Sequence, residues 1–320
     1  MNHAEVPLVA VVILTWNQRN LTLECLESLK SLQYPAERLN TILVDNGSCD
    51  GTTEAVRSLF PQVVVLENSD NLGFAEGNNV GISYALEYPA DYVMLLNNDT
   101  VVDNVMLAEM VAVMQQYPDV GIVGPKMLYF DDPERIWCAG NRIDWLLGSS
   151  IRLQADEQDK AIPNDMPVVV DFITACGILL RREALEQVGL LDPRFFIYYE
   201  ETDLCMRTWR AGWRILYVPS ARLWHKISAA MGPTSPATDY YMNRNVLLFL
   251  AKNRHGIAGW FSVCVAACRN LLAVAAYTVK PHGGARIPNR NARLFALRDA
   301  LVGRWGKMGR DVAKVCYPVS

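Results

Sequence analysis

The chain carries little excess charge of either sign. Its 320 residues contain 30 Lys and Arg against 34 Asp and Glu, which gives a formal net charge of −4. A nucleic-acid binder uses a basic field to neutralise phosphates, so we do not expect nucleic acid as a partner. The hydrophobic share of 51% indicates a globular protein, and the length suits one large α/β domain with a smaller appendage.

Processing and cross-linking signals are also scarce. The eight cysteines contain no C-x-x-C pair and no spacing typical of a disulfide framework, so we expect reduced structural thiols. The first residues lack the basic start, apolar core and cleavage site of a secretory signal peptide. We therefore expect a cytoplasmic protein.

Two common nucleotide-binding signatures are absent. The glycines at 73, 77 and 81 do not form a G-x-G-x-x-G fingerprint, and no G-x-x-x-x-G-K-[ST] loop occurs. These absences exclude dehydrogenases and P-loop ATPases. A sugar-nucleotide pyrophosphorylase stays open as an alternative, although residues 15–20 lack the glycines of its phosphate loop.

Apolar runs alternate with helical patterns through the first half of the chain. This alternation predicts an α/β fold with a doubly wound, mostly parallel sheet flanked by helices. In such sheets ligands bind at the carboxyl ends of the strands. We predict strands at residues 9–14, 41–44, 63–66, 92–96 and 168–173, and helices at residues 53–60, 75–86 and from Glu200.

The pattern is irregular from about residue 131 to 167, and the composition shifts after about Pro236. Residues 240–252 are typical of a helix, and Gly256–Val279 is a long apolar stretch interrupted by Arg269 and Asn270. We predict a catalytic domain over residues 1–235 and a helical C-terminal region over 236–320.

The apolar stretch has three interpretations. A central Arg costs about 3 kcal/mol on insertion scales, which disfavours a membrane-spanning helix. A helix lying on the membrane surface is favoured, and a plain packed helix is the other alternative. In the surface interpretation, the basic residues facing anionic headgroups are Arg269, Lys280, Arg286, Arg290 and Arg293.

Polar residues at two strand ends suit a nucleotide and its metal. Asp45 can accept hydrogen bonds from a base or ribose, or it can close an Asx-turn. Asp99 ends the run Asn97-Asn98-Asp99 and is our candidate ligand for Mg²⁺ or Mn²⁺, unless Asn98 or Asp99 caps a helix near Val101.

A loop and a lone histidine add to this edge. Residues 71–79 offer flexible backbone and amide side chains that would close on a nucleotide, with Asn71, Gly73 and Asn78 as candidate contacts. His225 follows Trp224 and is a candidate second metal ligand, although a lone His is more often structural.

Three carboxylates begin a predicted helix at Glu200, Glu201 and Asp203. The helix macrodipole favours the ionised form there, so one of them would accept a proton from a substrate hydroxyl. Alternatively, they are ordinary residues of a first helical turn, with Asp203 paired to Arg207.

In this order the motifs resemble glycosyltransferase family 2, especially its rhamnosyltransferase-like branch. The resemblance runs from about Val9 to His225. It implies a GT-A fold, an inverting single displacement and a divalent cation that bridges the donor phosphates. The pieces are VVILTWNQ, ILVDNGSCDGT, NLGFAEGNN, YVMLLNNDT, GIVGPKM, ILLRREALEQVGLLDPRFFIYYEETDLCMR and WH.

The resemblance also implies residue roles. Thr15, Asn17 and Asp45 match nucleotide contacts, to which we add Asn98. Asp99 matches the last aspartate of the D-x-D metal motif, His225 matches a metal-binding histidine of some relatives, and Glu201 falls at the general base.

Two departures from the family pattern affect these roles. The metal motif reads Asn97-Asn98-Asp99 and so has one carboxylate, and the usual Glu-Asp pair reads Glu200-Glu201. The second departure keeps Asp203 open as an alternative base, because a misplacement of about 1 Å is costly to catalysis.

We expect a transferase that moves a hexose or deoxyhexose, with rhamnose as one candidate, from a dTDP- or UDP-sugar. The acceptor would be lipid-linked or a saccharide, in surface-polysaccharide synthesis at the cytoplasmic face of the inner membrane. The alternative from another class is a non-catalytic saccharide-binding or scaffold protein.

Overall fold

The chain forms two compact units. The computed structural model describes residues 6–160, 166–226, 235–279 and 286–317. The first unit comprises Met1–Arg142, Arg152–Leu191 and Leu204–Ile227, and the second comprises Ile143–Ile151, Asp192–Asp203 and Ser228–Ser320. The second unit therefore takes in two short segments that precede the C-terminal helices in the sequence.

The parallel half of the sheet is built from β-branched apolar runs, as predicted. Strand β1 (Val9–Thr15) pairs in parallel with β2 (Leu39–Asp45) and β4 (Tyr92–Asn97), and β2 pairs with β3 (Val64–Glu67). Opposite Thr15 stands Asp45, and opposite Leu14 stands Asn97. The polar residues that follow these strands thus share one edge of the sheet.

The other half of the sheet is mixed. Strand β11 (Gly177–Arg181) runs antiparallel between β4 and β6 (Val120–Tyr129), and β12 (Arg214–His225) runs parallel to β6. A short strand, β5 (Thr100–Val102), pairs antiparallel with the end of β12. The register of β12 against β6 shifts between Val218 and Arg222, which marks a bulge. Over the described residues the order is β10-β12-β6-β11-β4-β1-β2-β3.

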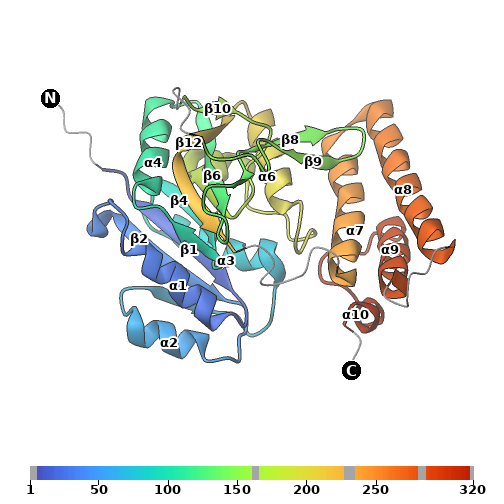
Figure 1. Ribbon diagram of the computed structural model, residues 1–320, viewed down its shortest axis with the longest axis horizontal. Coiled ribbons are helices and arrows are strands. Elements are labelled where there is room, and N and C mark those ends of the chain that lie inside the picture. Colours follow the sequence, from blue (N-terminus) through green and yellow to red (C-terminus); the bar gives the residue numbers. More distant parts are fainter. Residues whose placement is uncertain (1–5, 161–165, 227–234, 280–285, 318–320) are drawn as a thin grey trace. The chain divides into compact units, whose positions relative to one another are not determined.

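Helices flank this sheet (Figure 1). Helix α3 approaches β1 so closely that only glycine fits at two positions. An added Cβ at Gly81 would stand 2.3 Å from Val12 Cγ1, and one at Gly77 would stand 2.6 Å from Leu14 Cδ1. The glycines therefore serve helix–sheet packing. The helices are α1 (Arg19–Leu29), the 3₁₀ turn η1 (Ala36–Arg38), α2 (Thr52–Leu59), α3 (Gly73–Glu87), α4 (Met106–Gln116), α5 (Arg182–Val188) and α6 (Glu200–Arg210).

The segment predicted to be irregular contains three short strands. These are β7 (Ile136–Cys138), β8 (Asn141–Asp144) and β9 (Ser149–Arg152). Strand β7 extends the main sheet by pairing with β6, whereas β8 and β9 form a separate hairpin. The strand predicted over residues 168–173 is wrong in length: β10 spans only Val168–Val169, because its pairing with β12 stops there.

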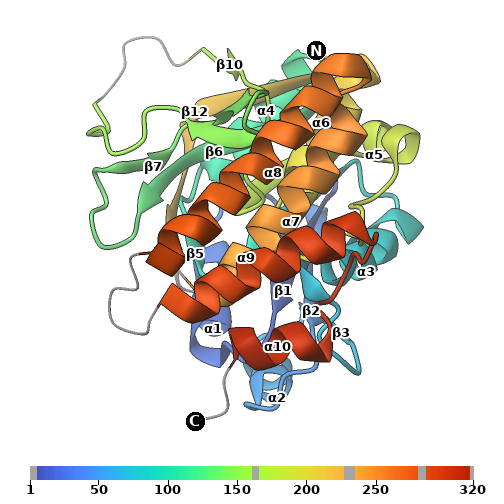
Figure 2. The same ribbon diagram turned by 90° about the vertical axis from the view of Figure 1, so that its right-hand side faces the viewer.

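Four helices dominate the second unit, where α8 contacts α7 and α9 (Figure 2). Ser235 caps α7 by accepting a hydrogen bond from Thr238 N at 3.1 Å, and Pro236 occupies the first turn. Buried Tyr240 and Tyr241 pack with Ala292 and Ala296 in its core. The helices are α7 (Pro236–Asn253), α8 (Gly256–Val279), α9 (Arg286–Leu301) and α10 (Arg310–Cys316).

Candidate active site

Asp99 and His225 meet through strand pairing. The β5–β12 register sets His225 opposite Thr100, next to Asp99. His225 Nε2 lies 3.3 Å from Asp99 Oδ1, and both side chains are buried. The alternative in which Asn98 or Asp99 caps a helix near Val101 is wrong, because β5 follows directly and α4 begins only at Met106.

This pair fits a small divalent cation. Asp99 Oδ1 is buried and accepts no hydrogen bond from the described residues, so it is available as an oxygen ligand. The described residues contain no group of three or more His, Cys, Asp or Glu that would form a complete protein cage. Mg²⁺ and Mn²⁺ commonly take only one or two protein ligands and complete their shells with substrate phosphates and water.

His225 is held from two further sides. The Cys176 Sγ atom lies 3.8 Å from His225 Nε2, and the Trp137 ring packs edge-on at a centroid distance of 4.7 Å. Burial lowers the pKa of His225, whereas Cys176 and Asp99 raise it by a larger amount, to about 10. The imidazole on its own is therefore protonated, and a bound cation would take the place of that proton. The imidazole is therefore fixed in position by contacts from three other elements of the fold.

The end of β2 forms a tight polar turn. Ser48 N donates to Asp45 Oδ2 at 2.8 Å. Asp45 therefore closes an Asx-turn, which was the alternative to a nucleotide contact. Asn17 has a left-handed φ of 52° and accepts from Cys49 N at 2.8 Å. These bonds connect the loops after β1 and β2 and hold Asp45 at the sheet edge.

The predicted amide contacts have local partners. Asn98 Nδ2 donates to Thr22 Oγ1 at 3.1 Å and to Thr15 Oγ1 at 3.3 Å, which brings Thr15 and Asn98 together behind the Asp99 loop. Asn78 Nδ2 donates to Phe74 O at 2.8 Å. In this structure Asn78 and Asn98 support the edge with their side-chain nitrogens.

Asn46 is a residue of this edge that the sequence reasoning missed. It is buried, donates to Gly73 O at 2.9 Å and accepts from Asn68 Nδ2 at 2.9 Å. Asn71 accepts from Gly73 N at 2.9 Å, so the start of α3 is anchored from both sides. The available signal was the position of Asn46 directly after Asp45.

Glu200 and Glu201 begin α6 in the second unit and are strongly desolvated. The Oε2 atom of each is buried without a hydrogen-bond partner among the described residues. Burial and the neighbouring Glu201 raise the pKa of Glu200 well above its usual range, and burial raises the pKa of Glu201 to about 7. Burial therefore outweighs the helix N-terminus that was expected to keep these carboxylates ionised.

Asp203 is engaged in an ion pair. It is fully buried, and Lys252 Nζ lies 2.7 Å from its Oδ2 while Asn253 Nδ2 donates to its Oδ1 at 2.8 Å. These partners come from the end of α7. Lys252 also contacts Asp192 at 2.8 Å, so the pairing ties the start of α6 to α7.

The loop before Glu200 has an unusual backbone. Phe196, Tyr198 and Tyr199 have φ of 66°, 71° and 76°, in the left-handed region that bulky residues avoid. Conformations of this kind cost about 1–3 kcal/mol per residue and persist only where surrounding contacts impose them. The chain thus reaches the two glutamates through a strained segment.

Arg244 and Asn245 of α7 hold that segment. Asn245 Nδ2 lies within 2.8, 2.8 and 2.9 Å of the carbonyl oxygens of Phe195, Ile197 and Tyr198, so its two N–H bonds are shared among three acceptors. Arg244 donates to Asn245 Oδ1 at 3.0 Å and orients the amide. We define Arg244 and Asn245 as the loop clamp, which the sequence reasoning also missed.

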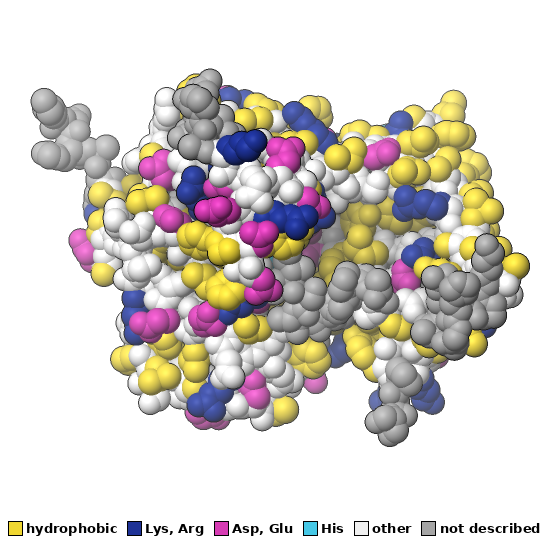
Figure 3. Space-filling view, viewed as in Figure 1, with side chains coloured by type: hydrophobic (Ala, Val, Ile, Leu, Met, Phe, Trp, Pro, Cys, Tyr) yellow, Lys and Arg dark blue, Asp and Glu magenta, His cyan; other side chains and the backbone are white. Residues whose placement is uncertain are grey.

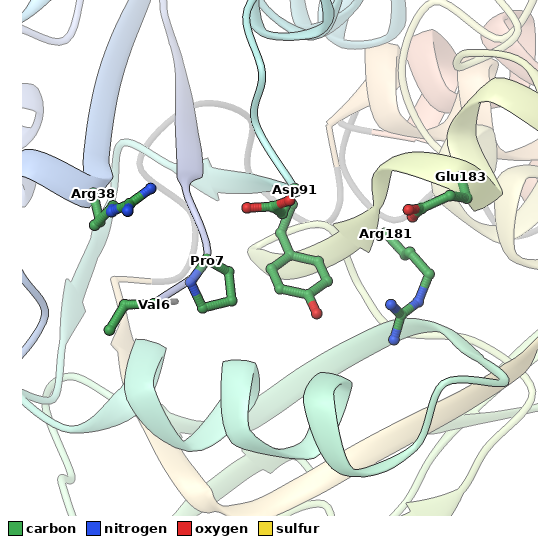
Figure 4. Close-up of a pocket in the computed structure, with 7 residues that line it drawn as sticks. Val6, Pro7, Arg38, Asp91, Arg181 and Glu183 are labelled. Carbon is green, nitrogen blue, oxygen red and sulfur yellow. The ribbon is translucent and has the colours of Figure 1, made fainter. Parts of the chain in front are cut away.

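A cavity of about 220 Å³ lies elsewhere in the first unit (Figure 4). It is found where β1 and β4 begin, at the edge opposite Asp45 and Asp99. Its charged groups are occupied: Asp91 accepts from Leu8 N at 2.7 Å, and Arg181 donates to Val120 O at 2.7 Å. We therefore place no chemistry there. The lining residues are Val6, Pro7, Arg38, Asp91, Tyr92, Arg181 and Glu183.

The chain is similar to known glycosyltransferases. Residues 10–189 match the model of glycosyl transferase family 2. An N-acetylglucosaminyl-diphospho-decaprenol L-rhamnosyltransferase of Mycobacterium tuberculosis is 28% identical over 73% of this chain and 80% of its own length. The dTDP-rhamnosyl transferase RfbF of Shigella flexneri is 24% identical over 77% and 80%.

Solved structures agree on the fold. A mannosyltransferase from Pyrobaculum calidifontis superimposes with a TM-score of 0.58 at 17% identity, covering 94% of this chain and 89% of its own. The TarS protein of S. aureus, residues 1–349, gives a TM-score of 0.58 at 16% identity, with 93% and 82% covered. The predicted GT-A fold is confirmed, and the pyrophosphorylase alternative has no support from these relatives.

Proposed function

The chain belongs to glycosyl transferase family 2, and we propose that it moves rhamnose or a related sugar from a dTDP- or UDP-sugar, with inversion at the transferred carbon. The observation that carries this proposal is the Asp99–His225 pair, buried at the carboxyl edge of the sheet beside the turn at Asp45. Two relatives named as rhamnosyltransferases support the choice of sugar.

We assign Asp99 and His225 as the protein ligands of Mg²⁺ or Mn²⁺. Such a cation offsets the charge that develops on a departing nucleoside diphosphate. The mannosyltransferase structure is described as a complex with GDP-Man and Mn²⁺, which supports this assignment. Thr15, Asn17, Asp45 and the start of α3 would hold the nucleotide.

We assign Glu201 as the general base. Its carboxylate takes the proton of the acceptor hydroxyl as the hydroxyl oxygen bonds to the sugar carbon and the bond from that carbon to the phosphate oxygen breaks. Glu200 retains its proton, since two adjacent buried carboxylates do not both ionise readily. Asp203, which is paired with Lys252, positions the start of α6.

The acceptor we propose is lipid-linked, in the synthesis of a surface polysaccharide. The mycobacterial relative is named for a sugar carried on diphospho-decaprenol. An acceptor of that kind lies in a membrane, so we propose that the enzyme works at the cytoplasmic face of the inner membrane.

Calorimetric titration tests the donor site. We expect UDP or dTDP to bind wild-type protein at least tenfold more tightly with Mn²⁺ than without it, because a cation held by Asp99 and His225 would attract the negatively charged diphosphate. In Asp99→Ala this gain should disappear. Asp91→Ala, at the opposite edge of the sheet, is the control and should retain it. If neither nucleotide binds with or without Mn²⁺, the scaffold alternative is favoured.

The pH dependence of turnover tests the base. Glu201 must be ionised to accept a proton, and burial raises its pKa to about 7. We expect kcat/KM to rise tenfold per pH unit below about 7 and to level off above it. A flat profile from pH 5.5 to 8 would contradict the assignment of Glu201.

A further inference from the structure

Helix α8 buries small and polar side chains and exposes large apolar ones, which is the reverse of a helix packed in water. Its buried residues are Gly259, Ser262, Ala266 and Asn270, which are small or polar. Large apolar side chains face outward instead, with Trp260 76% exposed and Leu272 72% exposed. In water a helix buries its apolar face, so this pattern fits a helix whose outer face meets an apolar medium.

The exposed face is long and nearly free of charge. It extends over the 24 residues of α8, in which Arg269 is the only charged residue. Figure 3 shows hydrophobic side chains gathered over this part of the second unit. Its large apolar members are Ile257, Trp260, Phe261, Leu271, Leu272 and Val279. A continuous apolar surface of this kind marks a binding face.

The inner face of α8 is fixed to polar groups of the same unit. Ser262 Oγ donates to Trp145 O at 2.8 Å, and Arg293 of α9 donates to Asn270 Oδ1 at 3.2 Å. By length and composition α8 would suffice to cross a membrane, among the residues the structure describes. Crossing would carry the charge of Arg269, in the middle of α8, into the hydrocarbon, so a position in the plane of the interface is favoured.

The uneven distribution of charge along the chain favours an anionic partner for the C-terminal region. Residues 252–320 contain twelve Lys and Arg and two Asp, whereas residues 1–251 contain eighteen Lys and Arg and 32 Asp and Glu. A second copy docked on the same face would bring two basic regions together. Anionic phospholipid headgroups complement this charge, at about 1 kcal/mol per basic residue near the surface.

We propose that α8 binds an anionic lipid bilayer, with its axis in the membrane plane and the side chains of Trp260, Phe261 and Leu272 inserted below the headgroups. Exposed basic residues of the C-terminal region, such as Arg269, Arg304 and Lys307, contact those headgroups. Binding to a bilayer would bring the enzyme to a lipid-linked acceptor, and in that respect the inference rests on the proposed function. The binding itself is inferred from α8 and the charge of the C-terminal region.

Vesicle flotation of the full chain tests the proposal. We expect at least tenfold stronger binding to vesicles of phosphatidylcholine with 30% phosphatidylglycerol than to phosphatidylcholine alone, at 150 mM NaCl. The double variant Trp260→Glu, Leu272→Glu should lose at least tenfold of that binding. The matched control Leu59→Glu, Tyr88→Glu changes two exposed apolar residues of the first unit and should bind as wild type does.

Equal binding of the two double variants would overturn the proposal. A second result would also overturn it: wild-type protein binds neither kind of vesicle and sediments as a dimer, whereas the Trp260→Glu, Leu272→Glu variant sediments as a monomer. The apolar face of α8 would then join two copies of the chain. The assay contains no donor sugar, so its failure would leave the proposed transferase reaction intact, and loss of nucleotide binding would leave the lipid result intact.

Discussion

Replacing Glu201 with Gln is expected to lower kcat about 10³-fold, the usual contribution of a positioned general base. Gln keeps the size of the side chain and cannot accept the acceptor proton. The melting temperature should stay the same or rise slightly, because a buried neutral amide removes the desolvation that raises the pKa of Glu201. Steady-state turnover with donor and acceptor and a thermal melt measure both effects.

Asp203→Asn separates the two candidate bases. It removes the fully buried one of the two carboxylates that pair with Lys252 and leaves Asp192, so we expect a melting temperature several degrees lower and a smaller loss of kcat than in Glu201→Gln. If instead Glu201→Gln keeps its turnover while Asp203→Asn folds normally and loses it, Asp203 is the base and our assignment fails.

Replacing Asn245 with Ala is expected to release the strained loop before Glu200. The loss of hydrogen bonds to three carbonyl groups, one buried and two partly buried, should lower the free energy of unfolding by about 3 kcal/mol. Because the loop leads directly into the glutamates, kcat should fall at least tenfold while KM for the donor changes little. Urea unfolding and steady-state kinetics measure the two quantities.

Asn243→Ala is the matched control, since it also removes a buried amide of α7. Among the residues that the structure describes, the Asn243 side chain bonds to Asp239 and Arg293 and makes no hydrogen bond to the loop, so we expect a stability loss with kcat close to wild type. Equal losses of kcat in both variants would show that α7 acts only through overall stability.

The sequence predicted elements with strong local signals. Strand β1 follows from an uninterrupted apolar run and helix α8 from a long apolar stretch, and α6 begins at Glu200 as expected. The strands of residues 131–167 were not predicted, because β7 and the β8–β9 hairpin are stabilised by pairing with partners rather than by their own composition.

The sequence predicted which residues carry the chemistry of the site, but it did not predict the residues that hold them in position. Asp99 follows a buried strand, which is a local signal, whereas its contact with His225 depends on a strand end 126 positions later in the chain. The loop clamp is also non-local: in the sequence Asn245 is one of several polar residues of α7, and only the fold shows the carbonyl groups that it contacts. Left-handed φ values at Tyr198 and Tyr199 had no sequence signal, since glycine is the residue that usually marks them.

The bulge in β12 makes the metal site sensitive to the length of the chain. The bulge lies between Val218 and Arg222, upstream of the pairing that sets His225 opposite Thr100. Residues 219–221 have no partner in β6, and a deletion that they do not take up would turn every later side chain to the other face of the sheet. A homologue could thus keep both Asp99 and His225 and still lose the site, so alignment gaps in this segment are as informative as substitutions of the ligands.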